Sequence, residues 1–358
     1  MRSYAKRRFL RDALTSSVGL LSSLSVFSTT RATAARSAVA CPNVPTPMKD
    51  VSGKVAFISG GSSGIGLGIA QTFAQAGMKV VIGYRSKEHL DEALKSLGDM
   101  SDRIHAVSVD VADRGAMERA AADTVKTFGK VHVLVANAGV TTMASLGKST
   151  YDDWDWVIGV NLTGVFNSVH AFLPYIQGNG EGGQIIAASS AGGLFATGGA
   201  GGAYTVSKFA VVGMMEALRG ELAEHNIGVS VYCPGSVTSN LPESERNRPG
   251  GLADVGVKLD DRAKASFMEQ IRDPQLAITP LEMGRLVLRG MRNNDLYILT
   301  HPEYEPLVHA RSEALLASFP TDIHPTRARA DSARALLQNS FYVTERDRRL
   351  CSAKFEQS

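Results

Sequence analysis

Cysteine is scarce in this chain of 358 residues, and its three copies, Cys41, Cys233 and Cys351, lie far apart. Metal-binding motifs place cysteines a few residues from one another, so we expect no metal site here, and the spacing does not suggest a disulfide framework. No uncharged apolar run reaches the roughly 18 residues that a membrane-spanning helix needs, which excludes a polytopic membrane protein. With 44% hydrophobic and 20% charged residues, the chain can bury a core.

The net charge of +3 is unevenly distributed along the chain. Residues 1–40 contain seven Lys or Arg and one acidic residue, so the rest of the chain carries a net charge of −3. The part that folds therefore lacks the positive excess of a nucleic-acid-binding protein, and we expect no nucleic-acid partner.

The first forty residues have the order of a removable signal peptide. Arg7 and Arg8 precede a weakly apolar, Ser-rich run over 13–27, and small residues follow up to position 40. Because this order resembles the twin-arginine export signal, we expect a periplasmic protein. An organellar transit peptide and an unprocessed tail on a cytoplasmic protein remain alternatives. Three prolines make residues 41–50 a stiff linker, so folding should begin near Val51.

From residue 54 onward, short apolar runs alternate with longer amphipathic segments. This pattern predicts strands near 55–59, 79–84, 103–109, 131–136, 184–189, 229–233 and 296–299. The expected fold is α/β: a single doubly wound (Rossmann) domain over 51–320, with a parallel seven-stranded sheet and helices on both faces. A polar stretch near 236–280, with a helix at 261–272, is a candidate lid. The tail over 321–358 has no predicted role.

A glycine-rich turn follows the first predicted strand and precedes a helix. Gly60, Gly64 and Gly66 are spaced so that the backbone can approach a pyrophosphate and the helix N-terminus can face its charge. Residues 80–87, at the end of the second strand, contain no acid, and Arg85 stands where a carboxylate would contact the ribose of NAD. NADP(H) is therefore favoured over NAD(H), which stays possible.

Tyr204 and Lys208 lie four residues apart at the start of a predicted helix, on one of its faces. A nearby ammonium lowers the pKa of a phenol, so Tyr204 is a candidate general acid or base. Ser190 closes the preceding strand, where its hydroxyl would face a ligand, and Ser189 is a weaker alternative. Asn161 lies within an apolar helical segment and needs polar partners, either in a core or in a site.

These motifs, in this order, resemble the classical short-chain dehydrogenase/reductase family across residues 51–300. The resemblance implies that Tyr204 exchanges a proton with the substrate oxygen, that Ser190 holds this oxygen, and that Lys208 binds the nicotinamide ribose and lowers the pKa of Tyr204. Asn161 would hold a water molecule in the proton relay. The resemblance and the glycine-rich turn together predict cofactor contacts at Gly60, Ser62, Ser63, Gly64, Ile65, Gly66, Arg85, Asp110, Val111, Asn137, Ala138, Gly139, Tyr204, Lys208, Pro234, Gly235, Val237 and Ser239.

The expected activity is hydride transfer between NADP and a carbonyl or secondary alcohol. The alternative is a non-catalytic dinucleotide-binding or regulatory protein on the same fold, because a fold does not fix a function. The expected partner is a small-molecule substrate, and Leu194 and Phe195 are apolar residues that could face it or belong to the core. By analogy with the family, we also expect a homo-oligomer.

Overall fold

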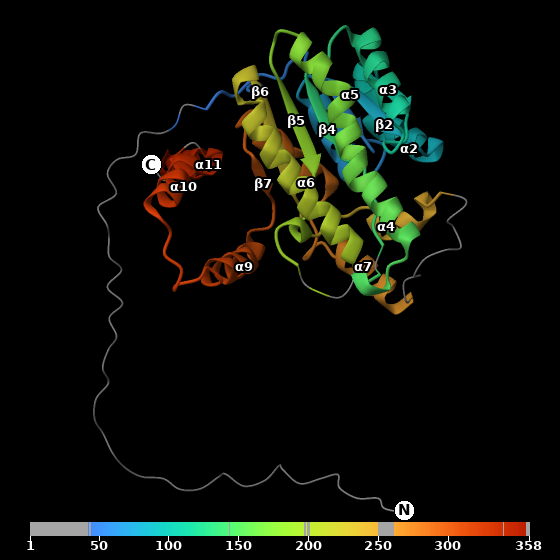
Figure 1. Ribbon diagram of the computed structural model, residues 1–358. Coiled ribbons are helices and arrows are strands. Elements are labelled where there is room, and N and C mark those ends of the chain that lie inside the picture. The colour runs from blue at the N-terminus through green and yellow to red at the C-terminus, as the bar shows by residue number, and fades with distance from the viewer. Residues whose placement is uncertain are drawn as a thin grey trace, which may run out of the picture. The chain divides into compact units, whose positions relative to one another are not determined.

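A parallel seven-stranded sheet forms the centre of the protein (Figure 1). This computed structural model describes residues 42–355 apart from 43, 143, 197, 199–200, 250–260 and 339. The strand order is β3-β2-β1-β4-β5-β6-β7, the doubly wound arrangement that the sequence predicts. The strands are β1 (Val55–Ser59), β2 (Lys79–Tyr84), β3 (Ile104–Ser108), β4 (Val133–Ala136), β5 (Gly183–Ala188), β6 (Ile227–Cys233) and β7 (Tyr297–Leu299).

Helices cover both faces of the sheet and create two apolar clusters. On one face the cluster includes Phe57, Leu134 and Phe172, and on the other it includes Ile58, Phe73 and Met283. The first face carries α3 (Arg114–Phe128), α4 (Tyr151–Ile158), α5 (Gly164–Gly178) and α6 (Gly202–Glu221). The second carries α1 (Gly64–Gln75), α2 (Lys87–Leu97) and α8 (Pro280–Arg292).

Central strands read as continuous apolar runs because both of their faces are covered. All residues of β1, β4, β5 and β6 are buried. Short helical turns connect the elements: η1 (Gly98–Arg103), η2 (Leu146–Lys148), η4 (Ala191–Gly193), η5 (Ala223–His225), η6 (Leu241–Asn247) and η8 (Pro302–Tyr304). A π-helical turn, η3 (Gly159–Thr163), joins α4 to α5.

Of the helices that the structure describes, the one spanning residues 151–178 is long and apolar enough to cross a membrane, with a mean hydropathy of 1.3. However, 61% of the most apolar stretch of this helix is buried inside the protein, where Phe172 packs on Phe57. These features are those of a core helix.

The folded body begins earlier than the sequence indicates. Met48 is fully buried, and the carbonyl of Pro45 accepts a hydrogen bond of 2.8 Å from the side chain of Asn294. The expected linker boundary near Val51 is therefore a few residues late, because a proline-rich composition does not reveal that Met48 fits the core. Residues 1–40, the predicted signal peptide, lie outside the described residues.

Three helices follow β7: α9 (Glu305–Ala317), α10 (Arg327–Gln338) and α11 (Phe341–Phe355). The last returns to the sheet, where Glu345 forms a buried ion pair with Arg219 of α6. Cys351 on α11 is disulfide-bonded, which the cysteine spacing did not indicate, whereas Cys233 is free and buried. Part of the tail therefore belongs to the folded body.

Candidate active site

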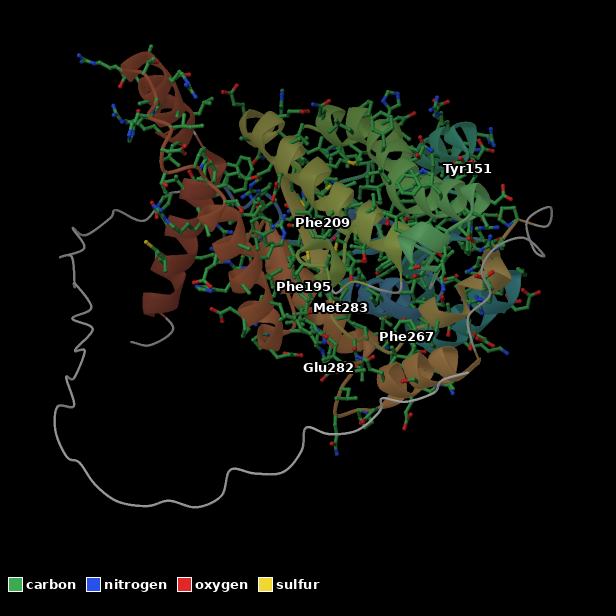
Figure 2. All side chains as sticks on the ribbon, turned by 60° about the horizontal axis from the view of Figure 1, so that its bottom comes forward. Tyr151, Phe195, Phe209, Phe267, Glu282 and Met283 are labelled. Carbon is green, nitrogen blue, oxygen red and sulfur yellow. The ribbon has the colours of Figure 1, made fainter. Side chains whose placement is uncertain are left out.

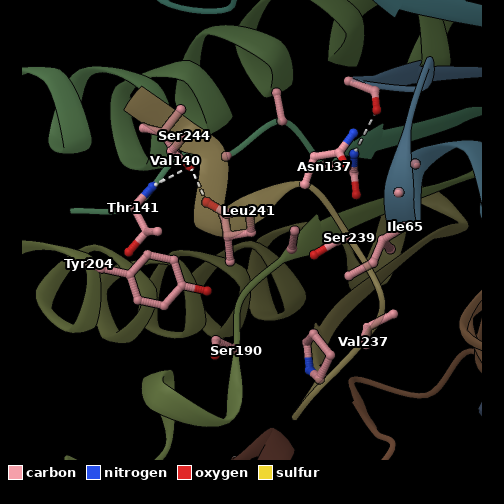
Figure 3. Close-up of a pocket in the computed structure, with 18 of the residues that line it drawn as sticks. Ile65, Asn137, Val140, Thr141, Ser190, Tyr204, Val237, Ser239, Leu241 and Ser244 are labelled. Carbon is pink, nitrogen blue, oxygen red and sulfur yellow. Dashed lines mark hydrogen bonds between the residues drawn. The ribbon is translucent and has the colours of Figure 1, made fainter. Parts of the chain in front are cut away.

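A cavity of about 550 Å³ lies at the carboxyl edge of the sheet, where doubly wound folds bind ligands. It brings together Ser190, Tyr204 and Lys208 with every residue that the sequence predicts to contact a cofactor. Figure 3 shows the ring of Tyr204 inside this cavity, between Thr141 and Leu241 on one side and Ser190 on the other. Of the predicted site residues, Asn161 does not line the cavity wall.

The glycine-rich turn fits the close approach of a ligand. Gly60 and Gly64 adopt positive φ angles of 64° and 51°, which favour glycine. A Cβ atom on Gly66 would lie 2.2 Å from the carbonyl oxygen of Gly60, so only glycine lets α1 begin here. Ser63 caps α1 without a side-chain hydrogen bond, and Ser62, Ser63 and Ile65 line the cavity. The first N–H groups of α1 are thus available to an anion.

Asn137 connects this turn to two strands. Its side-chain nitrogen donates to the carbonyl oxygens of Ser59 and Gly60 at 2.9 and 3.2 Å. Its side-chain oxygen accepts from the hydroxyl of Tyr232 at 2.6 Å. The hydroxyl of Ser59 accepts from the main-chain N–H groups of Asn137 and Ala138. These bonds fix the orientation of the amide and hold the turn against β4.

Arg85 follows β2 and reaches the cavity beside Asp110, which follows β3. Its guanidinium lies 3.7 Å from the carboxylate of Asp110 and donates to the carbonyl oxygen of Asn247 at 3.4 Å. Both side chains are 42% exposed. A cation therefore stands at the end of β2, as expected, but it shares the cavity with a carboxylate from the neighbouring strand.

Ser190, and not Ser189, presents its hydroxyl to the reacting end. Ser189 is buried and donates to the main-chain carbonyl of Lys208 at 2.8 Å, which ties β5 to α6. The hydroxyl of Ser190 accepts from the N–H of Gly192 at 3.1 Å and is a hydrogen-bonding partner of the Tyr204 phenol. The alternative based on Ser189 is therefore disfavoured.

The electrostatics of Tyr204 and Lys208 differ from the expectation. Burial raises the pKa of the Tyr204 phenol, and the hydrogen bond with Ser190 opposes this effect. Burial lowers the pKa of the Lys208 ammonium to about 8. This ammonium donates to the carbonyl oxygen of Ala188 at 2.9 Å and lies 5.4 Å from the centre of the Tyr204 ring. The expected lowering of the Tyr204 pKa by Lys208 is not found in this arrangement.

Asn161 is fully buried in the π-helical turn η3, just behind the cavity. Its side-chain oxygen accepts from the N–H of Val140, and its nitrogen donates to the carbonyl of Val140 and to the hydroxyl of Ser207. Both N–H bonds of the amide are therefore used within the protein. A Cβ on Gly139 would lie 3.5 Å from the Asn161 oxygen and 3.6 Å from the Lys208 nitrogen, so Asn161 and Lys208 flank this segment.

The segment after β6 also lines the cavity. Val237 pairs with Ile278. Ser239 lies against the start of α1, since a Cβ added to Gly64 would lie 3.2 Å from the Cβ of Ser239. The described part of the expected lid contains η6 and α7 (Asp261–Arg272), the latter with the predicted bounds. The hydroxyl of Ser244 in η6 accepts from the N–H of Thr141, which fastens η6 across the cavity (Figure 3).

Several residues that line the cavity carry no sequence motif and were missed: Tyr232, Leu241, Phe267, Ile271, Tyr304 and Leu307. Phe195 lines the cavity, whereas Leu194 packs against the core.

Within the described part of the chain, no group of three or more His, Cys, Asp or Glu side chains is arranged to hold a metal ion.

Comparisons with known proteins agree with this geometry. The sequence profile described as short chain dehydrogenase matches residues 54–249. The C alpha-dehydrogenase of a Sphingobium species is 36% identical over 284 residues, covering 79% of this chain and 92% of that protein. The 3-oxoacyl-acyl-carrier-protein reductase of Thermotoga maritima is 38% identical over 200 residues, covering 54% and 80%.

A short chain dehydrogenase/reductase from Burkholderia phymatum, solved in complex with NAD, has a similar structure. It is 31% identical, has a TM-score of 0.71, and the match covers 77% of this chain and 99% of that one. The chain belongs to the short-chain dehydrogenase/reductase family and is an oxidoreductase of that family.

Proposed function

We propose that this protein is an NADP-dependent oxidoreductase that interconverts a carbonyl group and a secondary alcohol, with Tyr204 as the proton donor or acceptor. The observation that carries the proposal is the convergence of Tyr204, Ser190 and Lys208 with the glycine-rich turn in one cavity. The nicotinamide supplies the hydride when it is bound. The chain's own side chains then orient the substrate and transfer the proton.

In the reductive direction, the substrate oxygen accepts hydrogen bonds from the hydroxyls of Ser190 and Tyr204. As the carbonyl carbon gains the hydride, its oxygen takes the phenolic proton of Tyr204, and water then returns a proton to the phenolate. Because burial raises the pKa of Tyr204, the phenol is protonated near neutral pH, which favours its role as an acid. In the oxidative direction the phenolate is needed, so that reaction should accelerate as the pH rises.

Lys208 and Asn161 act behind this pair. The ammonium of Lys208 lies beside Gly139 and would bind the ribose hydroxyls next to the nicotinamide. Because both N–H bonds of the Asn161 side-chain amide are occupied, Asn161 would hold the relay water by accepting a hydrogen bond from it at a carbonyl oxygen. A π-helical turn at this position fits such a role, because these turns are frequent at functional sites.

The residues present fit a dinucleotide, and we favour NADP over NAD. The end of β2 carries Arg85 and no carboxylate, and a guanidinium suits a 2′-phosphate. Asp110 offers a competing interaction with the ribose hydroxyls of NAD, and its carboxylate lies 3.7 Å from the Arg85 guanidinium. The relative affinities for NADPH and NADH therefore test the assignment. Titration with NADPH and NADH should show tighter NADPH binding. The Arg85→Ala variant should lose that preference, and equal affinities in the unchanged protein would contradict the assignment.

Tyr204→Phe tests the proposed activity against the non-catalytic alternative. The variant should bind NADPH like the unchanged protein and lose turnover of a panel of ketones, because only the reacting hydroxyl is removed. Unchanged turnover would overturn the role of Tyr204. A wild-type protein that binds NADPH and reduces no carbonyl would favour a regulatory protein.

We also propose that residues 1–40 direct export through the twin-arginine route to the periplasm. The disulfide at Cys351 supports an oxidising compartment. Sequencing the N-terminus of the mature protein should show cleavage after Ala34 or Ala40, and an intact Met1 would remove the proposal.

Association into a homo-oligomer is proposed as well. On α5, Phe166 and Tyr175 are 52% and 40% exposed, and Val206 on α6 is 36% exposed, so these helices offer apolar surface to a second copy. Sedimentation should show a species larger than the monomer, and a monomer at micromolar concentration would contradict it.

A further inference from the structure

Aromatic side chains from three separate segments line the cavity that contains Ser190 and Tyr204. Phe195 follows η4, the turn that Ser190 caps, and its N–H donates to the carbonyl of Ala191 at 3.3 Å. Phe267 belongs to α7, and Tyr304 ends η8 (Figure 2 labels Phe195 and Phe267). All three line the cavity. Only Phe195 falls within the region matched by the family profile, which ends at residue 249.

The ring of Tyr304 is held by defined contacts. Its centre lies 5.6 Å from that of Phe195 at an interplanar angle of 56°. It also stacks on His301, with ring centres 5.8 Å apart and planes at 22°. Such distances are those of interacting aromatic pairs. Tyr304 and Phe195 therefore form one aromatic wall.

His301 fastens this wall to the segment that faces the cofactor. The N–H of Gly235 donates to Nδ1 of His301 at 3.0 Å, and Nε2 of His301 lies 3.1 Å from the carbonyl oxygen of Ser236. Because Nδ1 accepts, Nε2 carries the proton and donates to Ser236. A Cβ on Gly235 would lie 2.5 Å from the Tyr304 ring, so glycine is what allows the rings to approach this segment.

The helix α7 also contacts the segment after β6 and lines the same cavity. The carbonyl of Ile271 accepts from the hydroxyl of Thr238 at 3.0 Å, and the side chain of Gln270 donates to Ser236. Phe267 lies one turn before Ile271 on the same helix face, and both line the cavity. A flat substituent on the reacting carbon would thus find both the aromatic wall and apolar side chains of α7 in the lining of the same cavity.

We propose that the substrate carries an aryl group on or next to its reacting carbonyl or carbinol carbon, and that Tyr304 and Phe195 select this group. The proposal rests on the proposed oxidoreductase function and names its substrate class. A ring of the substrate gains stacking contacts on the wall that a saturated ring of similar size does not. Selectivity therefore comes from a part of the chain that lies mainly outside the shared family motifs.

The test compares two ketones of the same connectivity, phenyl methyl ketone and cyclohexyl methyl ketone, at saturating NADPH. The quantity measured is the ratio of their kcat/KM values within each variant, so that losses of folding or cofactor binding cancel. Tyr304→Leu removes the ring, Tyr304→Phe keeps it, and Tyr151→Leu is the control, because Tyr151 is 90% exposed at the start of α4 (Figure 2).

Wild type, Tyr304→Phe and Tyr151→Leu should prefer the phenyl ketone by about tenfold, and Tyr304→Leu should lose most of this preference. A wild-type ratio near or below one, or a Tyr304→Leu variant that keeps the wild-type ratio, would overturn the proposal. If the wild type reduces no carbonyl at all, the proposed function itself fails, so the two failures are distinguishable.

Discussion

The hydroxyl of Tyr232 offers a sharp test of how the cofactor turn is built. It donates to the side-chain oxygen of Asn137 at 2.6 Å from a fully buried ring, and Asn137 in turn holds the carbonyls of Ser59 and Gly60. Tyr232→Phe removes this donor, so the Asn137 amide loses the hydrogen bond to its oxygen and keeps those of its nitrogen to Ser59 and Gly60. One such hydrogen bond contributes about 1 kcal/mol, so the Kd for NADPH should rise about fivefold if the loss is expressed in cofactor binding.

Tyr297→Phe is a matched control for this variant. Tyr297 also donates a hydrogen bond of 2.6 Å, but to Glu216 on α6, away from the cavity. Both variants should lower Tm, and only Tyr232→Phe should weaken NADPH binding in a fluorescence titration, with kcat at saturating cofactor within about twofold of wild type. Equal NADPH affinities for Tyr232→Phe and Tyr297→Phe would refute the reasoning.

Three further outcomes are expected. Carbonyl reduction should slow as the pH rises through about 8, where Lys208 loses the charge that burial has made easier to lose, and a rate that stays flat to about pH 10 would contradict this. Asp153→Asn should lower the free energy of unfolding by about 3 kcal/mol in urea, because the buried Arg248 guanidinium loses its buried carboxylate partner and keeps the partly exposed Glu245. Glu345→Gln should destabilise the protein in the same assay because the buried charge of Arg219 loses its carboxylate partner, and an unchanged urea midpoint would argue against a structural role for α11.

Features that depend on local spacing could be predicted from the sequence. The turn at Gly60, Gly64 and Gly66 and the pair Tyr204 and Lys208 each lie within a few residues, so a motif identifies them and the sheet topology brings them together. The helix at 261–272 was also predicted with its observed bounds, because its polar and apolar residues alternate with a helical period.

Features that depend on contacts between distant segments could not be predicted. Tyr304 and His301 meet Gly235 across more than sixty residues, and no short motif marks this approach. The pKa of Tyr204 is another example: one-dimensional spacing shows that Lys208 is near but does not show that its ammonium is bound to the carbonyl of Ala188. Burial then decides the direction of the shift.

The most direct test of the central claim follows the hydride itself. NADPH carrying deuterium at the transferable position of the nicotinamide is incubated with the protein and a ketone substrate, and the product is analysed by mass spectrometry. The account predicts an alcohol with one deuterium on its carbinol carbon for the wild type and no such product for Tyr204→Phe. Labelled alcohol formed equally well by Tyr204→Phe, or no label from a wild type that binds NADPH, would contradict it.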